Sequence, residues 1–118
     1  MPYTATHRFA RISPRKVRAL ADLVRGKFAD EALDILRFQP HRGARMLEKV
    51  IKSALGNAEH AQAPGVDDLV VVDARVDEGP MFKRIRPRAR GMAFGIKRRM
   101  SHIKVALDAV ATQPAAGE

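Results

Sequence analysis

Residues 79–104 read GPMFKRIRPRARGMAFGIKRRMSHIK and set the architecture of the whole chain. They contain nine Lys or Arg residues, six of them Arg, and no acid. The apolar residues are scattered among like charges, so the segment cannot share a hydrophobic core. A two-stranded ribbon alone is marginally stable in water, and guanidinium groups bind phosphate bidentately and stack on bases. The segment therefore predicts a long basic hairpin that becomes ordered against RNA.

The segments that flank this hairpin have the alternation of β-strands. Residues 69–76 are rich in valine, and residues 103–108 alternate apolar with other side chains, so we expect an antiparallel pair. Residues 3–11 contain Thr, Tyr and Phe and predict an edge strand. In the first flanking strand, one face is predicted to hold Val70, Val72, Ala74 and Val76, and the opposite face Val71, Asp73 and Arg75. In the second, Ile103, Val105 and Leu107 alternate with Lys104, Ala106 and Asp108.

Three helices are predicted between the first two strands. Ser13 is a candidate N-cap of the first helix, and Pro14 is a residue type favoured at the first helical position. Asp30 is a candidate N-cap of the second helix. The second helix should end before Gln39-Pro40, and the third spans about 41–61. The apolar positions at helical spacing are Val17, Leu20, Ala21, Val24, Ala32, Leu33, Leu36, Ala44, Leu47, Val50, Ile51, Ala54, Leu55 and Ala58.

These elements predict an α+β fold. A small three-stranded antiparallel sheet should pack on three helices, with a long basic β-hairpin as an extension. We expect residues 1–110 to form a single globular α+β domain that includes the hairpin at about 79–101. Residues 111–118 are rich in Ala, Pro and Gly and are expected to form a disordered tail.

The charge is unevenly distributed along the chain. The 22 Lys and Arg residues outnumber the 13 Asp and Glu residues, for a net charge of +9, which indicates a polyanionic partner. Residues 1–27 carry a net +6, whereas residues 28–78 carry a net −4. The first two helices could form a DNA-reading helix-turn-helix, but the second contains three acids and one terminal base. The predicted RNA-binding surface is therefore the first segment and the hairpin.

Catalysis, cofactors and membranes have no support in the sequence. There is no cysteine, the four histidines lack metal-ligand spacing, and no phosphate-binding loop or nucleophile elbow is present. Ser101 and His102 are adjacent on a predicted strand, so their side chains point to opposite faces. No signal-peptide segment or membrane-spanning run is found. We expect a cytoplasmic protein without cofactor or metal.

Several short motifs, in order, resemble the signature of the bacterial large-subunit ribosomal protein twenty-two family. The similarity runs from about His7 to Leu107. Relatives usually carry Arg where this chain has Met92 and Gly95, while Lys97 adds a base, so charge near the tip is redistributed. The matching motifs are Ser13 to Arg18, Asn57-Ala58-Glu59-His60, Asp77-Glu78-Gly79-Pro80, Lys83-Arg84, Pro87-Arg88-Ala89, Gly91, Arg98-Arg99 and Ser101-His102-Ile103.

The resemblance implies a structural constituent of the large ribosomal subunit, not an enzyme. Such a protein binds large-subunit rRNA, supports assembly and lines the nascent-peptide exit tunnel with its hairpin. The implied partners are large-subunit rRNA, neighbouring large-subunit ribosomal proteins and the nascent polypeptide, with no membrane and no homo-oligomer. A free RNA-binding regulator or RNA chaperone is the alternative from a different class.

The resemblance also implies which residues contact RNA. The expected hairpin tip is Arg88, Ala89, Arg90, Gly91, Met92, Ala93 and Phe94. The expected rRNA-binding residues are Arg8, Arg11, Arg15, Lys16, Arg18, Asn57, His60, Lys83, Arg84, Arg86, Arg88, Arg90, Lys97, Arg98, Arg99 and His102.

Overall fold

A computed structural model describes residues 2–63, 65, 68–87, 89–91 and 93–109. The predicted tail at 111–118 lies outside the described residues. The elements in chain order are β1 (Tyr3–Ala10), α1 (Pro14–Val24), α2 (Ala29–Arg37), α3 (Arg42–His60), β2 (Leu69–Pro87), a 3-10 turn (Ala89–Gly91) and β3 (Ala93–Ala109).

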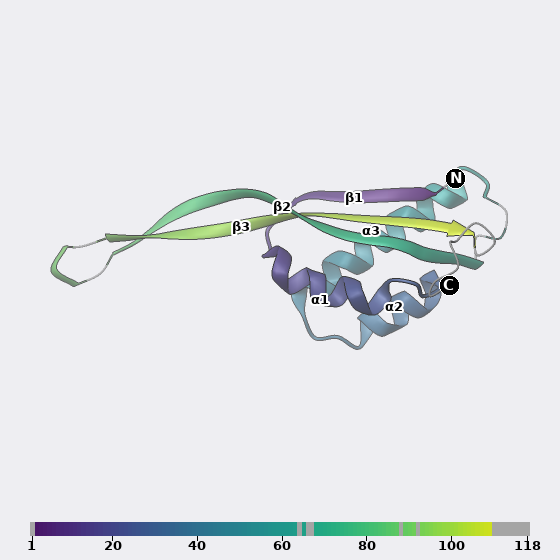
Figure 1. The fold of residues 1–118 in the computed structure, drawn as a ribbon, viewed down its shortest axis with the longest axis horizontal. Helices are drawn as coiled ribbons and strands as arrows, with labels where there is room; N and C mark the ends of the chain where they lie inside the picture. The colour runs from purple at the N-terminus through teal and green to yellow at the C-terminus, as the bar shows by residue number, and fades with distance from the viewer. Residues whose placement is uncertain (1, 64, 66–67, 88, 92, 110–118) are drawn as a thin grey trace, which may run out of the picture.

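The three strands form one antiparallel sheet in the order β1-β3-β2. The helices lie on one face of this sheet, with α1 packed on β2 and α3 on β1 (Figure 1). β1 is therefore an edge strand, as predicted, and β3 is the central strand. The α+β fold with three helices and three strands is confirmed.

The hydrophobic core lies between the helices and the sheet. Ile103, Val105 and Leu107 of β3 are fully buried, as their alternation predicts. Each helix buries the apolar stripe expected from its sequence, except that Leu33 and Leu55 are only partly buried at the margin of the core. Periodicity alone therefore locates most of the core.

The predicted division of β2 into two faces is wrong in its first half. The pairing with β3 shifts by one residue between Val71 and Asp73, so Val72 is an extra residue in a β-bulge. Because side chains alternate with a period of two, one extra residue exchanges the two faces of the strand. The residues of β2 that face the main core are Leu69, Val71, Ala74 and Val76. Val70 and Val72 lie on the other face, where Val70 is nevertheless buried and Val72 is partly buried.

The second helix starts differently from the prediction. Phe28, not Asp30, occupies the N-cap position, and Asp30 lies in the first turn. The turn before that point is fixed against β2, because the Gly26 N–H donates to the Val71 carbonyl (2.8 Å) and the Val71 N–H donates to the Lys27 carbonyl (2.9 Å). Pairing with β2 therefore decides where the helix begins.

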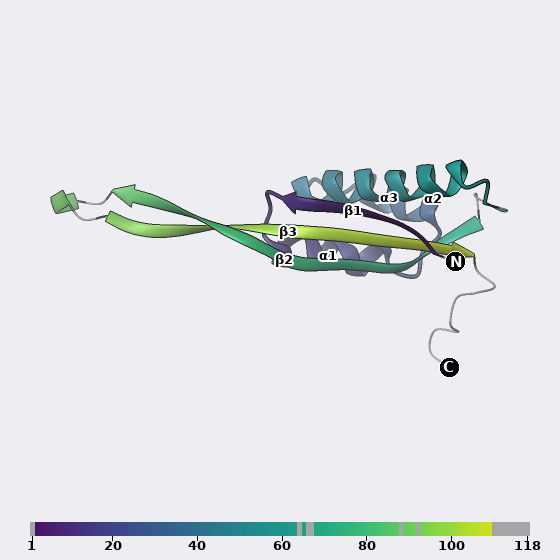
Figure 2. The same ribbon diagram turned by 90° about the horizontal axis from the view of Figure 1, so that it is seen from above.

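Beyond the helices, β2 and β3 continue as a two-stranded ribbon (Figure 1). Their pairing runs from Met81 opposite Arg99 to Pro87 opposite Ala93. The ribbon twists strongly along its length, so the strands cross in Figure 2. The molecule is 64 Å long with a radius of gyration of 17.3 Å, against about 13.5 Å for a compact chain of this length. The predicted hairpin extension is confirmed.

Two β-bulges flank β3 at residues 100–102, where the sheet becomes the ribbon. Residues 79–80 of β2 lie opposite Met100, and residues 8–9 of β1 lie opposite His102. Bulges bend a strand and increase its twist. We call this region the junction; it directs the hairpin away from the helices.

Candidate nucleic-acid interface

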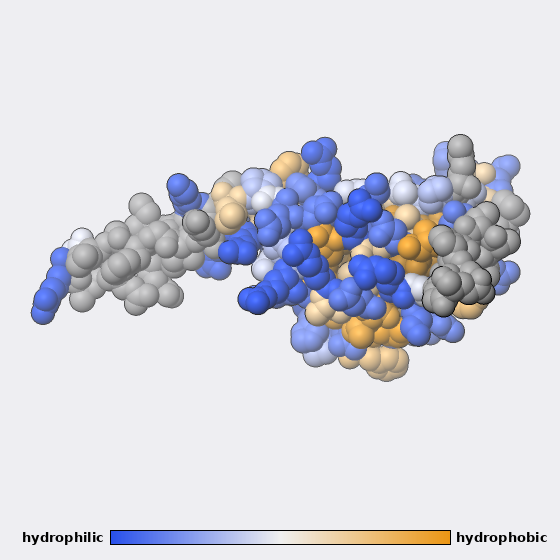
Figure 3. Space-filling model, viewed as in Figure 1, coloured by the Kyte–Doolittle hydropathy of each residue, from blue (hydrophilic) through white to orange (hydrophobic). Residues whose placement is uncertain are grey.

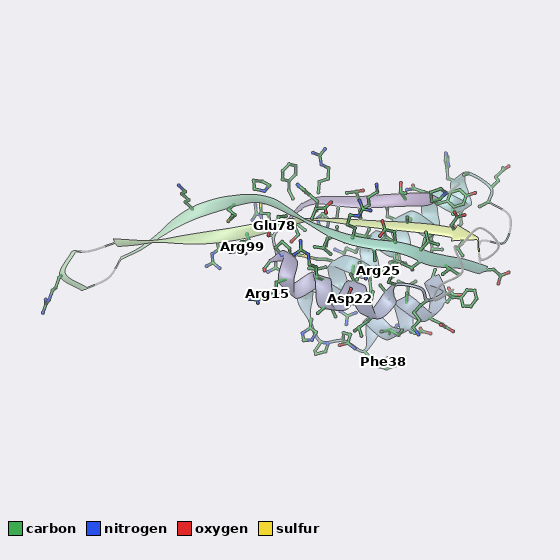
Figure 4. All side chains as sticks on the ribbon, viewed as in Figure 1. Arg15, Asp22, Arg25, Phe38, Glu78 and Arg99 are labelled. Atoms are coloured by element: carbon green, nitrogen blue, oxygen red, sulfur yellow. The ribbon has the colours of Figure 1, made fainter. Side chains whose placement is uncertain are left out.

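Basic side chains that are far apart in the sequence gather at the junction. Arg11 follows β1, Arg15 and Lys16 lie in the first turn of α1, and Arg98 and Arg99 lie on β3; all five residues are exposed. Arg15 of α1 and Arg99 of β3 both lie where α1 begins, at the side of the molecule that continues into the hairpin (Figure 4). Hydrophilic residues dominate the surface there (Figure 3). The structure therefore brings together these residues, which the sequence predicted as RNA contacts.

An open cleft of about 1270 Å³ lies beside the junction, between α1, the loop at 39–43 and β3. α1 and α3 both begin at this cleft, and the N-terminal ends of helices favour anions. The described residues that line it include no acid and five bases, namely Arg11, Lys16, Arg42, Arg98 and Arg99. The cleft is thus suited to phosphate.

Some predicted RNA contacts also hold the fold together. The Arg18 Nε–H donates to the Val76 carbonyl at 3.1 Å, which ties α1 to β2. His102 Nδ1 accepts a hydrogen bond from the Phe9 N–H at 3.1 Å, so this backbone donor in the β1 bulge has a partner. Substituting either residue would therefore disturb the junction as well as any RNA contact.

Asn57 and His60 lie apart from the junction. Both belong to the last turns of α3, whose other end is next to the cleft. The Asn57 amide donates to the Thr4 carbonyl at 2.8 Å, so it anchors the start of β1. These two predicted contacts do not join the basic cluster.

The hairpin turn lies inside the predicted tip. Arg90 and Gly91 have positive φ angles of 64° and 69°, the left-handed conformation that glycine adopts readily. Lys83 and Arg90 are exposed, and Gly95 pairs with Ile85 within the ribbon, outside the turn. Several predicted contacts have side chains outside the described residues: Arg84, Arg86, Arg88, Lys97, Ala89, Met92, Ala93 and Phe94.

Sequence reasoning missed Arg42. Its guanidinium donates to the Arg11 carbonyl, which connects the start of α3 to the turn after β1. The residue sits in the net acidic middle of the chain, so charge distribution gave no reason to choose it. Only the packing of α3 against α1 brings it to the cleft.

Phe9 was also missed. It has a φ of 58°, its side chain is 49% exposed, and its ring meets that of His102 edge-on, with centroids 5.0 Å apart. The Arg8 guanidinium lies 5.4 Å from the centroid of the Phe9 ring. The break in alternation at residues 8–9 is the one sequence signal of this bulge.

Comparison with known proteins identifies the chain. The family model for ribosomal protein L22p/L17e matches residues 5–108. The chain belongs to this family. It is 64% identical over 110 residues to the large ribosomal subunit protein uL22 of Rhodopirellula baltica, covering 89% of this chain and 92% of that protein. The resemblance drawn from the sequence motifs is therefore confirmed.

Two further relatives of this L22p/L17e family member carry the same description. The large ribosomal subunit protein uL22 of Caldicellulosiruptor saccharolyticus is 56% identical over 104 residues, covering 88% of this chain and 85% of the relative. The large ribosomal subunit protein uL22 of Maridesulfovibrio salexigens is 51% identical over 105 residues, covering 89% of this chain and 96% of the relative. The similarity spans both the helices and the hairpin, so it concerns the whole architecture.

The relatives of this L22p/L17e protein are ribosomal proteins, a structural and non-enzymatic family. Here the Ser101 hydroxyl is buried and donates to the Ile12 carbonyl at 2.6 Å, while His102 bonds to β1, so the two side chains do not pair. The described residues contain no group of three His, Asp or Glu side chains that could hold a metal ion. None of the described helices is long and apolar enough to cross a membrane.

Proposed function

We propose that this L22p/L17e family member binds large-subunit rRNA and lines the nascent-peptide exit tunnel with its hairpin. It acts in the ribosome, in the bacterial cytoplasm, as a structural constituent that supports subunit assembly. Its partners are rRNA, neighbouring ribosomal proteins and the nascent polypeptide, and it does not form homo-oligomers. The observation that supports this most is the acid-free, nine-base segment 79–104, whose strands extend the sheet past the helices.

RNA phosphate would stabilise the charged hairpin better than water does. A free two-stranded ribbon has few favourable contacts, and the like charges along this one repel each other. RNA backbone on both sides supplies counter-charge and lets guanidinium groups bind phosphates. The ribbon from Met81 to Pro87 is seven residues long, which at about 3.3 Å per residue reaches about 23 Å beyond the junction. That length carries the tip into an RNA shell while the helices remain outside it.

The first test is the salt dependence of rRNA binding by the isolated protein. If on the order of six phosphates are engaged, affinity should fall roughly a thousandfold between about 50 and 200 mM salt, because bound counterions are released. Arg99→Gln should lower the slope of log K against log salt by about one. Lys52→Gln, on the exposed side of α3, is the matched control and should leave the slope unchanged. A nearly flat response of the unmodified protein would contradict the proposal.

The second test separates docking from tunnel function by deleting residues 88–94. The helices, sheet and junction bases remain, so the variant should still enter large subunits at full occupancy. Subunits that contain it should respond abnormally to tunnel-bound macrolides or to stalling nascent chains. Normal tunnel behaviour at full occupancy would contradict the tunnel role, and absence from purified subunits would show that the tip is needed for docking. A stoichiometric position in sedimented large subunits would also exclude a free regulator.

A further inference from the structure

The cleft beside the junction has a lining that charge attraction alone does not explain. Its bases lie next to an apolar wall: Lys16, Ala19 and Leu23 follow one another along α1 at helical spacing and line the cleft, and Leu20 and Met100 lie beside them. Leu23 is 45% exposed. The cleft therefore offers an exposed apolar side chain in addition to its bases.

The cleft is formed by three segments that are distant in the sequence. Residues 11–13, 39–43 and 98–100 contribute to it together with α1. Arg42 fastens the first two by donating to the Arg11 carbonyl. The close approach of α3 to α1 is permitted by Gly43, where a Cβ would lie 3.2 Å from both Ile12 Cδ1 and Leu20 Cδ1. The fold therefore sets the shape of the cleft from several sides.

We propose that this cleft receives an unpaired RNA nucleotide, and this rests on the proposed rRNA binding. Lys16, Arg98 and Arg99 hold the phosphates at the rim. The base lies against Ala19 and Leu23, the exposed residues of the apolar wall. Proteins that bind unstacked bases stack them on aromatic side chains or on Arg guanidinium planes along a positively charged groove. Here Arg98 and Arg99 supply the guanidinium planes at the rim. The volume of about 1270 Å³ exceeds that of most small-ligand pockets, roughly 300–1,000 Å³, so flanking nucleotides also fit.

RNA fits this site better than an acidic peptide. Arg98 and Arg99 belong both to the cleft and to the base of the hairpin. An RNA strand that follows the hairpin bases therefore reaches the cleft without a change of partner. A peptide of Asp and Glu would satisfy the rim charges but has no aromatic ring to lie against the apolar wall.

The test fills the cleft without changing its charge. Ala19→Gln places a larger, uncharged and non-aromatic side chain at an exposed position that lines the cleft, and Ser53→Gln adds the same side chain to the exposed surface of α3 as the control. We expect rRNA affinity to fall about tenfold for Ala19→Gln, the loss of one stacked base, with the salt slope unchanged. Ser53→Gln should bind normally, and circular dichroism should show both variants folded.

Two single-stranded probes of equal charge sharpen the result. The unmodified protein should prefer an oligonucleotide over its abasic counterpart by about tenfold, and Ala19→Gln should reduce that preference toward one. Equal binding of both probes by the unmodified protein would overturn the inference, as would a polyglutamate peptide of the same charge that competes as well as the oligonucleotide. If the salt titration shows rRNA binding and these results fail, only the nucleotide site is wrong. If rRNA binding itself is absent, the proposed function fails.

Discussion

The same two strands behave as two different structures along their length. In the sheet half of β2 and β3, side chains such as Ile103 and Leu107 are fully buried beneath the helices. In the hairpin half the backbone pairing is unbroken from Met81 to Pro87, but no helix lies over it (Figure 1). Burying a Leu or Ile side chain contributes roughly 1.5–3 kcal/mol. Backbone pairing is thus enough to continue a strand, whereas burial of side chains in a core is what stabilises it.

The largest effect should follow from truncating a core residue in the sheet half. Ile103→Ala removes a fully buried side chain and should lower the free energy of unfolding by about 2–5 kcal/mol. Met81→Ala is the matched change in the hairpin half, at a side chain that is 47% exposed, and should stay within about 0.5 kcal/mol. Urea denaturation measures both. Similar losses from the two variants would mean that the ribbon contributes to the same cooperative core.

A smaller effect is expected at the junction, where a glycine permits the bulge. A Cβ at Gly79 would lie 3.2 Å from the carbonyl carbon and oxygen of Met100, so Gly79→Ala should destabilise by about 1–3 kcal/mol. Gly56 is exposed within α3, and a Cβ added there would meet no atom within 4 Å. Gly56→Ala should therefore stabilise by about 0.5–1 kcal/mol. Thermal denaturation of both variants gives the sign, and stabilisation by Gly79→Ala would show that the junction backbone yields easily.

Most of the fold could be predicted because its signals are local and periodic. The stripe of α3 and the alternation of β3 each bury the residues that their periods select. The failures occur where a distant segment overrides the local pattern. The bulge at Val72 exchanges the faces of β2. Hydrogen bonds of Gly26 and Lys27 with Val71 make the second helix begin after Phe28, before the N-cap expected at Asp30.

The interface could be predicted only in part. Arg15, Lys16, Arg98 and Arg99 stand out because they belong to basic segments of the sequence. The cleft beside them could not be seen, because residues 11–13, 39–43 and 98–100 meet only after α1 and α3 pack together. Charge reveals which segments bind a polyanion, and tertiary packing decides what shape they present to it.

Hydrogen exchange along β2 and β3, in free protein and in its complex with large-subunit rRNA, shows whether the hairpin depends on RNA for its order. We expect slow exchange in both states at residues 103–107 of the central strand and at those amides of residues 70–76 that face β3. At residues 81–86 and 93–99 we expect fast exchange in free protein, because a ribbon without a core opens easily, and strong protection in the complex. Slow exchange of the hairpin amides in free protein, or no added protection on rRNA binding, would contradict this dependence on RNA.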